Sequence, residues 1–242
     1  MTSLNLSRKN LGAADAELLA AAMTKFMGSL TVADMRYNEL DIESATILAN
    51  IAKQKTISLC GITPDQTQAD FSPTDSVHGP FLKPADAVLL TADLAVRGSL
   101  TSIDVRKNSI TGDGASQLSA AVLANVKIEK FNEIPIKEMR TDSITELNLN
   151  HKFIGIEGGM VVAGLMPVMG SLTAANLLSN SFDVDSAAML LKIKEEKPQL
   201  LTLCGLTHEE TKLDLHDKGL GPADAMLLAP EITVMGSLTH IE

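Results

Sequence analysis

Apolar and polar residues alternate in short stretches that recur along the chain. The recurring pattern is Leu-x-x-Leu-x-Leu-x-x-Asn-x-Leu, in which other apolar residues substitute for Leu. Its copies begin at Met1, Leu30, Leu100, Ile144 and Leu172, with a shorter copy from Leu213. The alternation within each copy, as at Leu4 and Leu6, predicts a short strand with one buried face.

A second periodic signal follows each copy, with apolar residues spaced by three and four positions. This spacing predicts an amphipathic helix. The expected buried faces include Ala16, Leu19, Ala20 and Met23 in the first helix and Ala225, Leu228, Ala229 and Ile232 in the last. A strand and a helix repeating every 28 or 29 residues form one unit, which buries its apolar face only by stacking on its neighbours.

These motifs resemble the leucine-rich repeats of the ribonuclease-inhibitor-like class, over nearly all of the 242 residues. The resemblance implies an α/β solenoid with a curved parallel sheet on the concave face and helices on the convex face. We expect one domain spanning residues 1–242. Because the motif runs to both ends without a polar cap, we expect a fragment or one subunit of a larger assembly.

The repeats also pair into a longer unit. Leu59-Cys60-Gly61-Ile62 returns as Leu203-Cys204-Gly205-Leu206, 144 residues later, and Pro84-Ala85-Asp86-Ala87 returns 138 residues later. The first copy therefore has six extra residues, which we place at Pro73–His78 as a loop. Closely spaced strand signals, and Pro135 after Phe131, predict irregular breaks near residues 60–70, 128–143 and 204–212.

Composition narrows the class of protein. Apolar residues make up 45% of the chain and aromatic residues 3%, with no Trp, which suits small repetitive packing layers. Cys60 and Cys204 replace buried Leu residues, so we expect reduced thiols. A net charge of -10 disfavours nucleic acid. The longest apolar run, Met160 to Met169, is too short for a membrane span, and without a signal peptide we expect a soluble cytoplasmic protein.

Side chains between the buried strand positions are expected to point outward together, in three columns. The first reads Asn5, Asp34, Asp70, Asp104, Asn148, Asn176, Asp214. The second reads Ser7, Arg36, Ser72, Arg106, Asn150, Leu178, His216. The third contains Arg8, Tyr37, Lys107, His151, Ser179 and Asp217.

The columns predict a docking surface for a protein partner with exposed basic groups, because an acidic stripe favours complementary charge. The candidate partner-binding residues are Asp34, Arg36, Tyr37, Asp70, Asp104, Arg106, Lys107, Asn148, Asn150, His151, Asn176, Asp214 and His216. A structural interpretation stays open, in which hydrated Asp and Asn pair with neighbouring Arg or Lys. Asn38, Asn108 and Asn180 are expected to bond backbone groups at the strand ends.

Catalytic signals are weak. The sequence contains neither a phosphate-binding Gly loop nor a Ser-His-Asp grouping, and His151 and His216 fit a repeat-imposed surface better than acid-base chemistry. We therefore predict no catalytic residue, metal or cofactor, and favour a non-enzymatic protein-protein interaction scaffold. The alternatives are a regulator of an enzyme, such as a GTPase-activating leucine-rich repeat protein, and a structural subunit of a larger complex.

Overall fold

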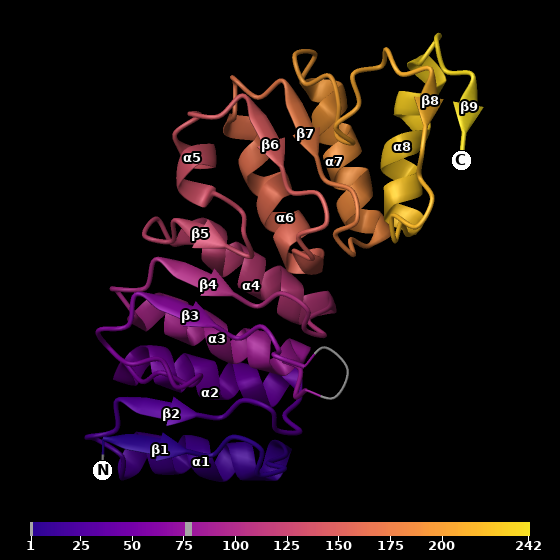
Figure 1. The fold of residues 1–242 in the computed structure, drawn as a ribbon. Helices are drawn as coiled ribbons and strands as arrows, with labels where there is room; N and C mark the ends of the chain where they lie inside the picture. The colour runs from indigo at the N-terminus through magenta and orange to yellow at the C-terminus, as the bar shows by residue number, and fades with distance from the viewer. Residues whose placement is uncertain (1, 76–78) are drawn as a thin grey trace. The chain divides into compact units, whose positions relative to one another are not determined.

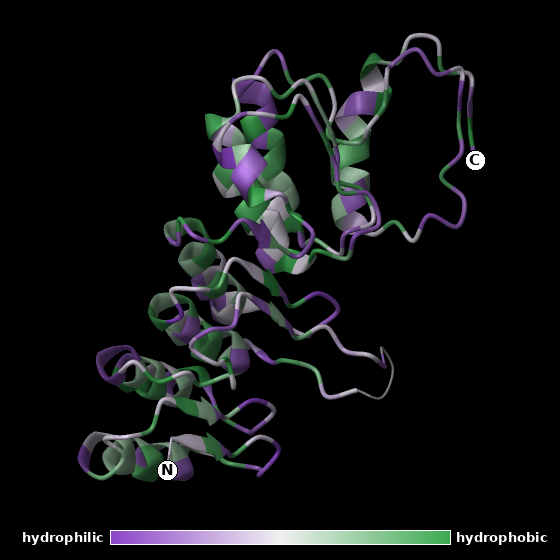
Figure 2. Ribbon diagram, turned by 60° about the vertical axis from the view of Figure 1, so that its left-hand side comes forward, coloured by the Kyte–Doolittle hydropathy of each residue, from purple (hydrophilic) through white to green (hydrophobic). Residues whose placement is uncertain are grey.

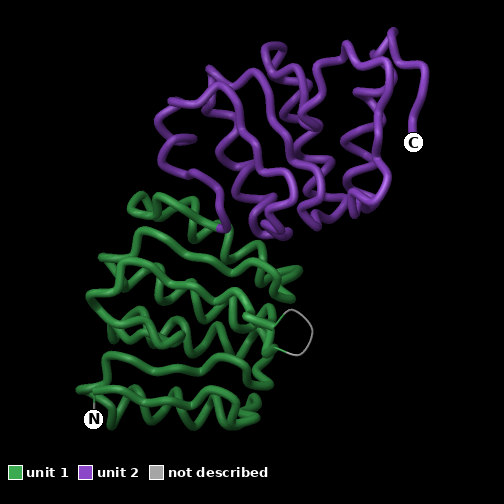
Figure 3. The backbone as a smooth tube through the Cα atoms, viewed as in Figure 1, with its two compact units in different colours: residues 1–131 green, residues 132–242 purple. Residues whose placement is uncertain are grey.

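The structure is a computed structural model that describes residues 2–75 and 79–242. Met1, the first position of the first motif copy, and the last three residues of the expected loop at Pro73–His78 lie outside the described residues. The chain forms two compact units, residues 1–131 and residues 132–242 (Figure 3). We describe each unit separately.

Strands and helices alternate along the first unit, and each helix packs against the next one (Figure 1). The strands pair in parallel: β1 pairs with β2, and β4 pairs with both β3 and β5. The pairing register aligns equivalent motif positions, such as Leu4 with Ala33 and Ala69 with Ile103. The elements are β1 Ser3–Asn5, α1 Ala13–Lys25, β2 Val32–Asp34, α2 Ile42–Lys55, β3 Gln68–Asp70, α3 Pro84–Val96, β4 Ser102–Asp104, α4 Gly112–Ala124 and β5 Lys130–Phe131.

The second unit repeats this alternation after a short helix. Strand β6 pairs in parallel with β7, and β8 with β9, while α6, α7 and α8 pack in sequence. Its elements are α5 Ile136–Arg140, β6 Glu146–Asn148, α6 Gly155–Leu165, the 3-10 helix η1 Met166–Val168, β7 Ala174–Asn176, α7 Val184–Glu196, β8 Lys212–Leu213, α8 Pro222–Val234 and β9 His240–Ile241. Among the described residues, no helix is long and apolar enough to cross a membrane.

The predicted apolar positions of the strands form the core of each unit. The motif residues Met35, Val105, Leu149 and Leu177 are buried. Leu6, which follows β1, and Leu215, which follows β8, are half-buried. The strands described here make up four small parallel sheets. A mixed α/β fold with parallel strands backed by helices is therefore confirmed.

Most helices bury one face, whereas all residues from Ala85 to Leu94 of α3 are buried. Figure 2 shows hydrophobic and hydrophilic residues mixed along the helices. The predicted buried face is largely correct for α1, where Ala16, Ala20 and Met23 are buried and Leu19 is half-buried. For α8, Leu228 is buried as predicted, but Ala225 and Ala229 are exposed and Ile232 is half-buried. The buried face of α8 is instead formed by Ala223, Asp224, Leu227, Leu228 and Glu231. Because two of these residues are carboxylates that bond buried backbone groups, hydrophobicity alone does not identify the face.

All three predicted breaks are present. Residues 58–60 form isolated bridges to β2, and the chain then turns at Gly61, whose φ is +77°. Residues 202–204 bridge to β7 in the same manner, followed by Gly205 with φ +70°. At the middle break, Asn132 and Glu133 both have positive φ, and α5 follows Pro135. The two cysteines of the equivalent segments, Cys60 and Cys204, are buried free thiols as predicted.

The motif asparagines bond backbone groups at the strand ends, as predicted, and they also bond the preceding copy of the motif. Asn38 Oδ1 accepts hydrogen bonds from the amides of Lys9 and Leu11, at 2.9 and 3.1 Å, and its Nδ2 donates to the carbonyls of Leu6 and Met35. Asn108 and Asn180 form corresponding bonds in their own repeats. These hydrogen bonds therefore connect the end of each strand to the end of the preceding strand.

Candidate partner-binding face at the strand ends

The first column of polar residues supports the turns that end the strands. Each side-chain Oδ1 accepts a hydrogen bond from the backbone amide two residues later, for example Asp70 from Ser72 at 2.8 Å and Asp214 from His216 at 2.9 Å. The same bond is made by Asn5, Asp34, Asp104, Asn148 and Asn176. This is an Asx-turn, which short Asp and Asn side chains favour. The polar column is therefore explained first by the hydrogen bonds that its side chains accept from the backbone.

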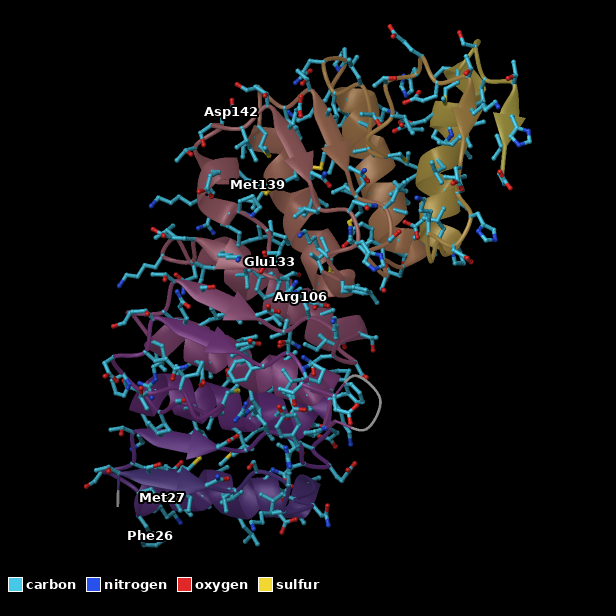
Figure 4. The ribbon with its side chains drawn as sticks, viewed as in Figure 1. Phe26, Met27, Arg106, Glu133, Met139 and Asp142 are labelled. Carbon is cyan, nitrogen blue, oxygen red and sulfur yellow. The ribbon has the colours of Figure 1, made fainter. Side chains whose placement is uncertain are left out.

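The acidic stripe is partly neutralised within the chain. Arg36 Nη2 lies 2.7 Å from Asp34 Oδ2, and Arg106 Nη2 lies 2.7 Å from Asp104 Oδ2. Both carboxylates are largely covered, with 14% and 19% of the side chain exposed. Figure 4 labels Arg106 beyond the carboxyl end of β4. The expected stripe is thus reduced in the first unit mainly to Asp70, which is exposed.

Arg36 is also held by aromatic rings. Its guanidinium carbon lies 4.8 Å from the ring centroid of Phe71 and 5.4 Å from that of Tyr37. Arg8 approaches the same Tyr37 ring at 5.3 Å. Burial raises the pKa of Tyr37, although the charge of Arg36 opposes the rise. These contacts bring Asp34, Arg36 and Tyr37 together as one cluster at the end of β2.

The third column adopts left-handed backbone conformation. Its residues Arg8, Tyr37, Lys107, His151, Ser179 and Asp217 have φ between +53° and +62°. Non-Gly residues rarely adopt this region, in which Asn and Asp are favoured. Arg8, Lys107, His151 and Asp217 are exposed there, Tyr37 is half-buried and Ser179 is buried.

Two hollows adjoin the strand ends of the second unit. Asn150, His151, Asn176 and Asp214 line one with a volume of about 350 Å³. Asn148 and Asn176 line the other, of about 280 Å³. Leu178 and Ser179, predicted to point outward, are instead buried at 7% and 8% exposure in the wall of the larger hollow. Ser179 is held there by hydrogen bonds to Asp224 and to the Lys218 carbonyl. His216 lies outside both linings, with its Nδ1 3.3 Å from Asp217 Oδ2.

Two buried carboxylates were missed by the sequence interpretation. Asp93 on α3 accepts hydrogen bonds from Ser58 Oγ at 2.7 Å and from the amides of Leu59 and Cys60 at 2.6 and 3.0 Å. In the second unit, Glu231 on α8 accepts from Thr202 Oγ1 and the Leu203 amide, both at 2.6 Å. Each carboxylate thus accepts hydrogen bonds from the backbone segment at which a break begins.

A signal for these residues is present in the sequence. Asp93 and Glu231 follow Asp86 and Asp224 by seven residues, so each pair lies on one helical face. Asp86 Oδ1 accepts from the Tyr37 amide at 2.9 Å, and Asp224 Oδ1 from the Ser179 amide at 2.8 Å. Two acidic residues seven positions apart on an otherwise apolar helix therefore mark one helix face. The first acid accepts a hydrogen bond from the turn after a strand, and the second accepts hydrogen bonds from the break.

The two equivalent carboxylates have opposite pKa shifts. Burial raises the pKa of Asp93 to about 6, although its hydrogen bonds oppose the rise. Burial also raises the pKa of Glu231, but the bonds from Thr202, Leu203 and Lys194 outweigh it, so the net pKa is lowered. Lys194 Nζ lies 3.0 Å from Glu231 Oε1. Its ammonium group helps to lower the pKa of Glu231, together with the hydrogen bonds from Thr202 and Leu203.

No group of three or more His, Cys, Asp or Glu residues within the described ranges could hold a metal ion. Comparison with protein-family models and with curated proteins finds no match for this sequence.

Proposed function

We propose that the chain is a leucine-rich repeat module that binds a protein partner, without catalysis, through the strand-end face. The proposed architecture is a solenoid in which the strands line one concave face. Three features support it: the spacing of the motif copies, the parallel register that aligns equivalent positions, and the asparagine bonds between neighbouring repeats.

One observation carries this proposal: long polar side chains occupy the left-handed turns that follow β1, β4 and β6. Arg8, Lys107 and His151 adopt φ values of 58°, 60° and 56°, where Gly, Asn or Asp would fold at lower cost. The left-handed backbone recurs at all six third-column positions and belongs to the turn, whereas the choice of long side chains at such positions costs stability and favours a functional role. Exposed side chains at equivalent turns of a repeated scaffold are typical of a binding surface.

Charge indicates the kind of partner. The chain carries a net charge of -10, and Asp70, Asp214 and Asp217 are exposed at the strand ends, whereas Asp34 and Asp104 are paired with arginines. We infer that the partner contributes basic groups to these three carboxylates. Such attraction accelerates association and weakens as salt is added.

The experiment replaces the turn side chains while keeping their backbone conformation. Asn tolerates positive φ better than most residues, so the test variant combines Arg8→Asn, Lys107→Asn and His151→Asn. The matched control combines Lys25→Asn, Lys53→Asn and Lys192→Asn, which change exposed helix residues. Both variants and the parent chain are immobilised, and the proteins retained from an extract of the native source are quantified by mass spectrometry.

The proposal expects partners that the parent and the control retain and the turn variant loses, with circular dichroism showing all three chains folded. Equal retention by the turn variant would reject the strand-end face. Loss only in the control would instead assign binding to the helices, as expected for a structural subunit. Faster GTP hydrolysis by a captured GTPase would replace the scaffold with the regulatory alternative.

A further inference from the structure

The two units contain equivalent copies of one structural feature, the strand segment at a break and its neighbours. Ala33 N donates to Ser58 O at 2.7 Å, and Ala175 N donates to Thr202 O at 2.9 Å. Gly61 N and Gly205 N donate to the carbonyls of Ala33 and Ala175, both at 2.9 Å. The backbone around the two breaks can therefore be compared residue by residue.

In the first unit, the space between the end of β2 and the end of β3 is occupied by the Arg36 side chain. Arg36 reaches from the turn after β2 to the Phe71 ring, at 4.8 Å, while its Nε and Nη2 donate to Asp34 at 2.9 and 2.7 Å. Asp34 itself lies over Gly61, where an added Cβ would be 3.4 Å from its Oδ2. Only 20% of the Arg36 side chain is exposed.

In the second unit, smaller residues stand at the equivalent positions. Leu178, Ser179 and Leu215 replace Arg36, Tyr37 and Phe71, and Asn176 replaces Asp34 over the second glycine. All four line the hollow of about 350 Å³. Its volume falls within the range of about 300 to 1000 Å³ that is typical of ligand sites.

We propose that this hollow binds an arginine side chain supplied by the protein partner. The inference rests on the proposed function, because it names the group through which that partner would engage the second unit. The arginine would take the position that Arg36 occupies in the first unit. The first unit therefore shows an arginine side chain in the equivalent position.

The lining suits an apolar stem that ends in a planar cation. Leucine side chains from the turn after β7, the break and β8 provide the apolar walls, namely Leu178, Leu206, Leu213, Leu215 and Leu220. Asp214 and Asp217 provide carboxylates, and the amide oxygens of Asn150 and Asn176 provide neutral acceptors. A guanidinium has five N–H donors for such oxygens and is less strongly hydrated than an ammonium.

The lining contains fewer cationic than anionic side chains when His151 is neutral. Lys218 also lines the hollow, and its ammonium group repels a cation. The lining contains two carboxylates, Asp214 and Asp217, and one ammonium group, and Asp217 Oδ2 also lies 3.3 Å from His216 Nδ1. We therefore expect arginine to be preferred over a neutral side chain of the same shape.

The test uses three capped tripeptides, Gly-Arg-Gly, Gly-Lys-Gly and Gly-citrulline-Gly, in which citrulline keeps the shape of arginine without its charge. Binding is followed by NMR of the leucine methyl groups in the full-length chain. A single side chain gives weak binding, with a Kd on the order of millimolar. We expect the arginine peptide to shift Leu178, Leu206 and Leu215 and to bind at least tenfold more tightly than the citrulline peptide.

A filled hollow provides the second measurement. The variant Leu178→Arg with Asn176→Asp recreates the pair of the first unit and should weaken the arginine peptide at least tenfold. Leu201→Arg, at a position that is 63% exposed and outside the lining, adds the same charge and should leave binding unchanged. Backbone amide spectra establish that both variants are folded.

Each outcome bears on the inference. Equal binding of arginine and citrulline, shifts confined to other leucines, no detectable binding, or unchanged binding in the filled variant would each overturn it. Preference for the lysine peptide would also overturn it, in favour of a lysine site. If the peptide test fails while the turn variant still loses its partners, only the arginine site is rejected and the strand-end face stands.

Discussion

The buried carboxylates Asp93 and Glu231 hold equivalent backbone segments, yet they are predicted to change stability with pH in opposite directions. The perturbations are Asp93→Asn and Glu231→Gln, made one at a time, because each keeps the side-chain shape and removes the charge. Both side chains are fully buried, at 0% exposure. Their titration is therefore linked directly to folding.

For Asp93, the folded pKa of about 6 lies above the ordinary value of 3.8. Its contribution to stability is then fully present below about pH 4 and is lost as the pH rises through 6, because the native state must ionise a buried group. With about 1.4 kcal/mol per pKa unit, the contribution changes by about 2 kcal/mol between pH 7.5 and pH 4.5. The free-energy cost of Asp93→Asn should therefore be about 2 kcal/mol larger at pH 4.5.

For Glu231, the folded pKa lies below the ordinary value of 4.5. Its contribution is present above pH 4.5 and is lost as the pH falls through the folded pKa, because protonation breaks the pairing with Lys194. The cost of Glu231→Gln should therefore shrink below pH 4.5, and it should not rise between pH 7.5 and pH 4.5. The two substitutions thus have pH dependences of opposite sign.

Urea unfolding measures both effects. Tyr37 is the only tyrosine of a chain without tryptophan, so its fluorescence reports the first unit alone. Amide hydrogen exchange of Leu203 and Cys204 reports the second unit. Glu17→Gln and Glu195→Gln, at exposed positions, are the controls. If both buried carboxylates gave the same slope, or if the cost of Asp93→Asn were the same at pH 7.5 and 4.5, the assignment of opposite environments would be wrong.

Three further predictions concern stability. Leu149→Ala should lower the free energy of urea unfolding by about 2 to 5 kcal/mol, since it opens a cavity at a position with 2% exposure. The control Ser7→Ala should change this free energy by less than about 0.5 kcal/mol. Equal effects of the two substitutions would refute the burial of Leu149. Gly205→Ala should cost more than about 1 kcal/mol, because φ is +70° there, and Gly236→Ala, in open space, should cost less; the comparison is made by thermal unfolding. Asn180→Ala should cost about 2 to 4 kcal/mol by removing bonds to backbone groups of two repeats, and exchange protection of the Lys152 amide unchanged from the parent would argue against this role.

The repeating elements could be predicted from the sequence because each copy carries its own local signal. Strand alternation and helical spacing lie within single repeats, and the motif asparagines recur at fixed positions. The breaks were also predictable, since the next strand signal follows Cys60 and Cys204 too soon for a full repeat. These features depend on neighbours along the chain, which the sequence displays directly.

The inward carboxylates could not be recognised from local polarity. Asp224 and Glu231 on α8 look like solvent-facing residues, and the apolar residues beside them suggested another face of the helix. Their partners, Ser179 and Leu203, are 45 and 28 residues away in the chain. Burial of a charged group becomes favourable only when such distant backbone amides converge on it. The same limitation applied to Leu178, whose burial depends on a hollow built from four separate segments.

Comparison of the two copies separates residues that the scaffold requires from residues that it leaves free. The positions that keep the same chemical role in both copies all bond or accommodate backbone, and they are Ser58 and Thr202, Gly61 and Gly205, Asp86 and Asp224, and Asp93 and Glu231. The positions that differ in size and charge, Arg36 and Leu178, Tyr37 and Ser179, and Phe71 and Leu215, lie together at the strand ends. Because the first set makes the same kind of hydrogen bonds in both copies, the second set differs without loss of this network. Divergence concentrated on one face, over an unchanged supporting network, is what distinct binding roles for the two units would produce.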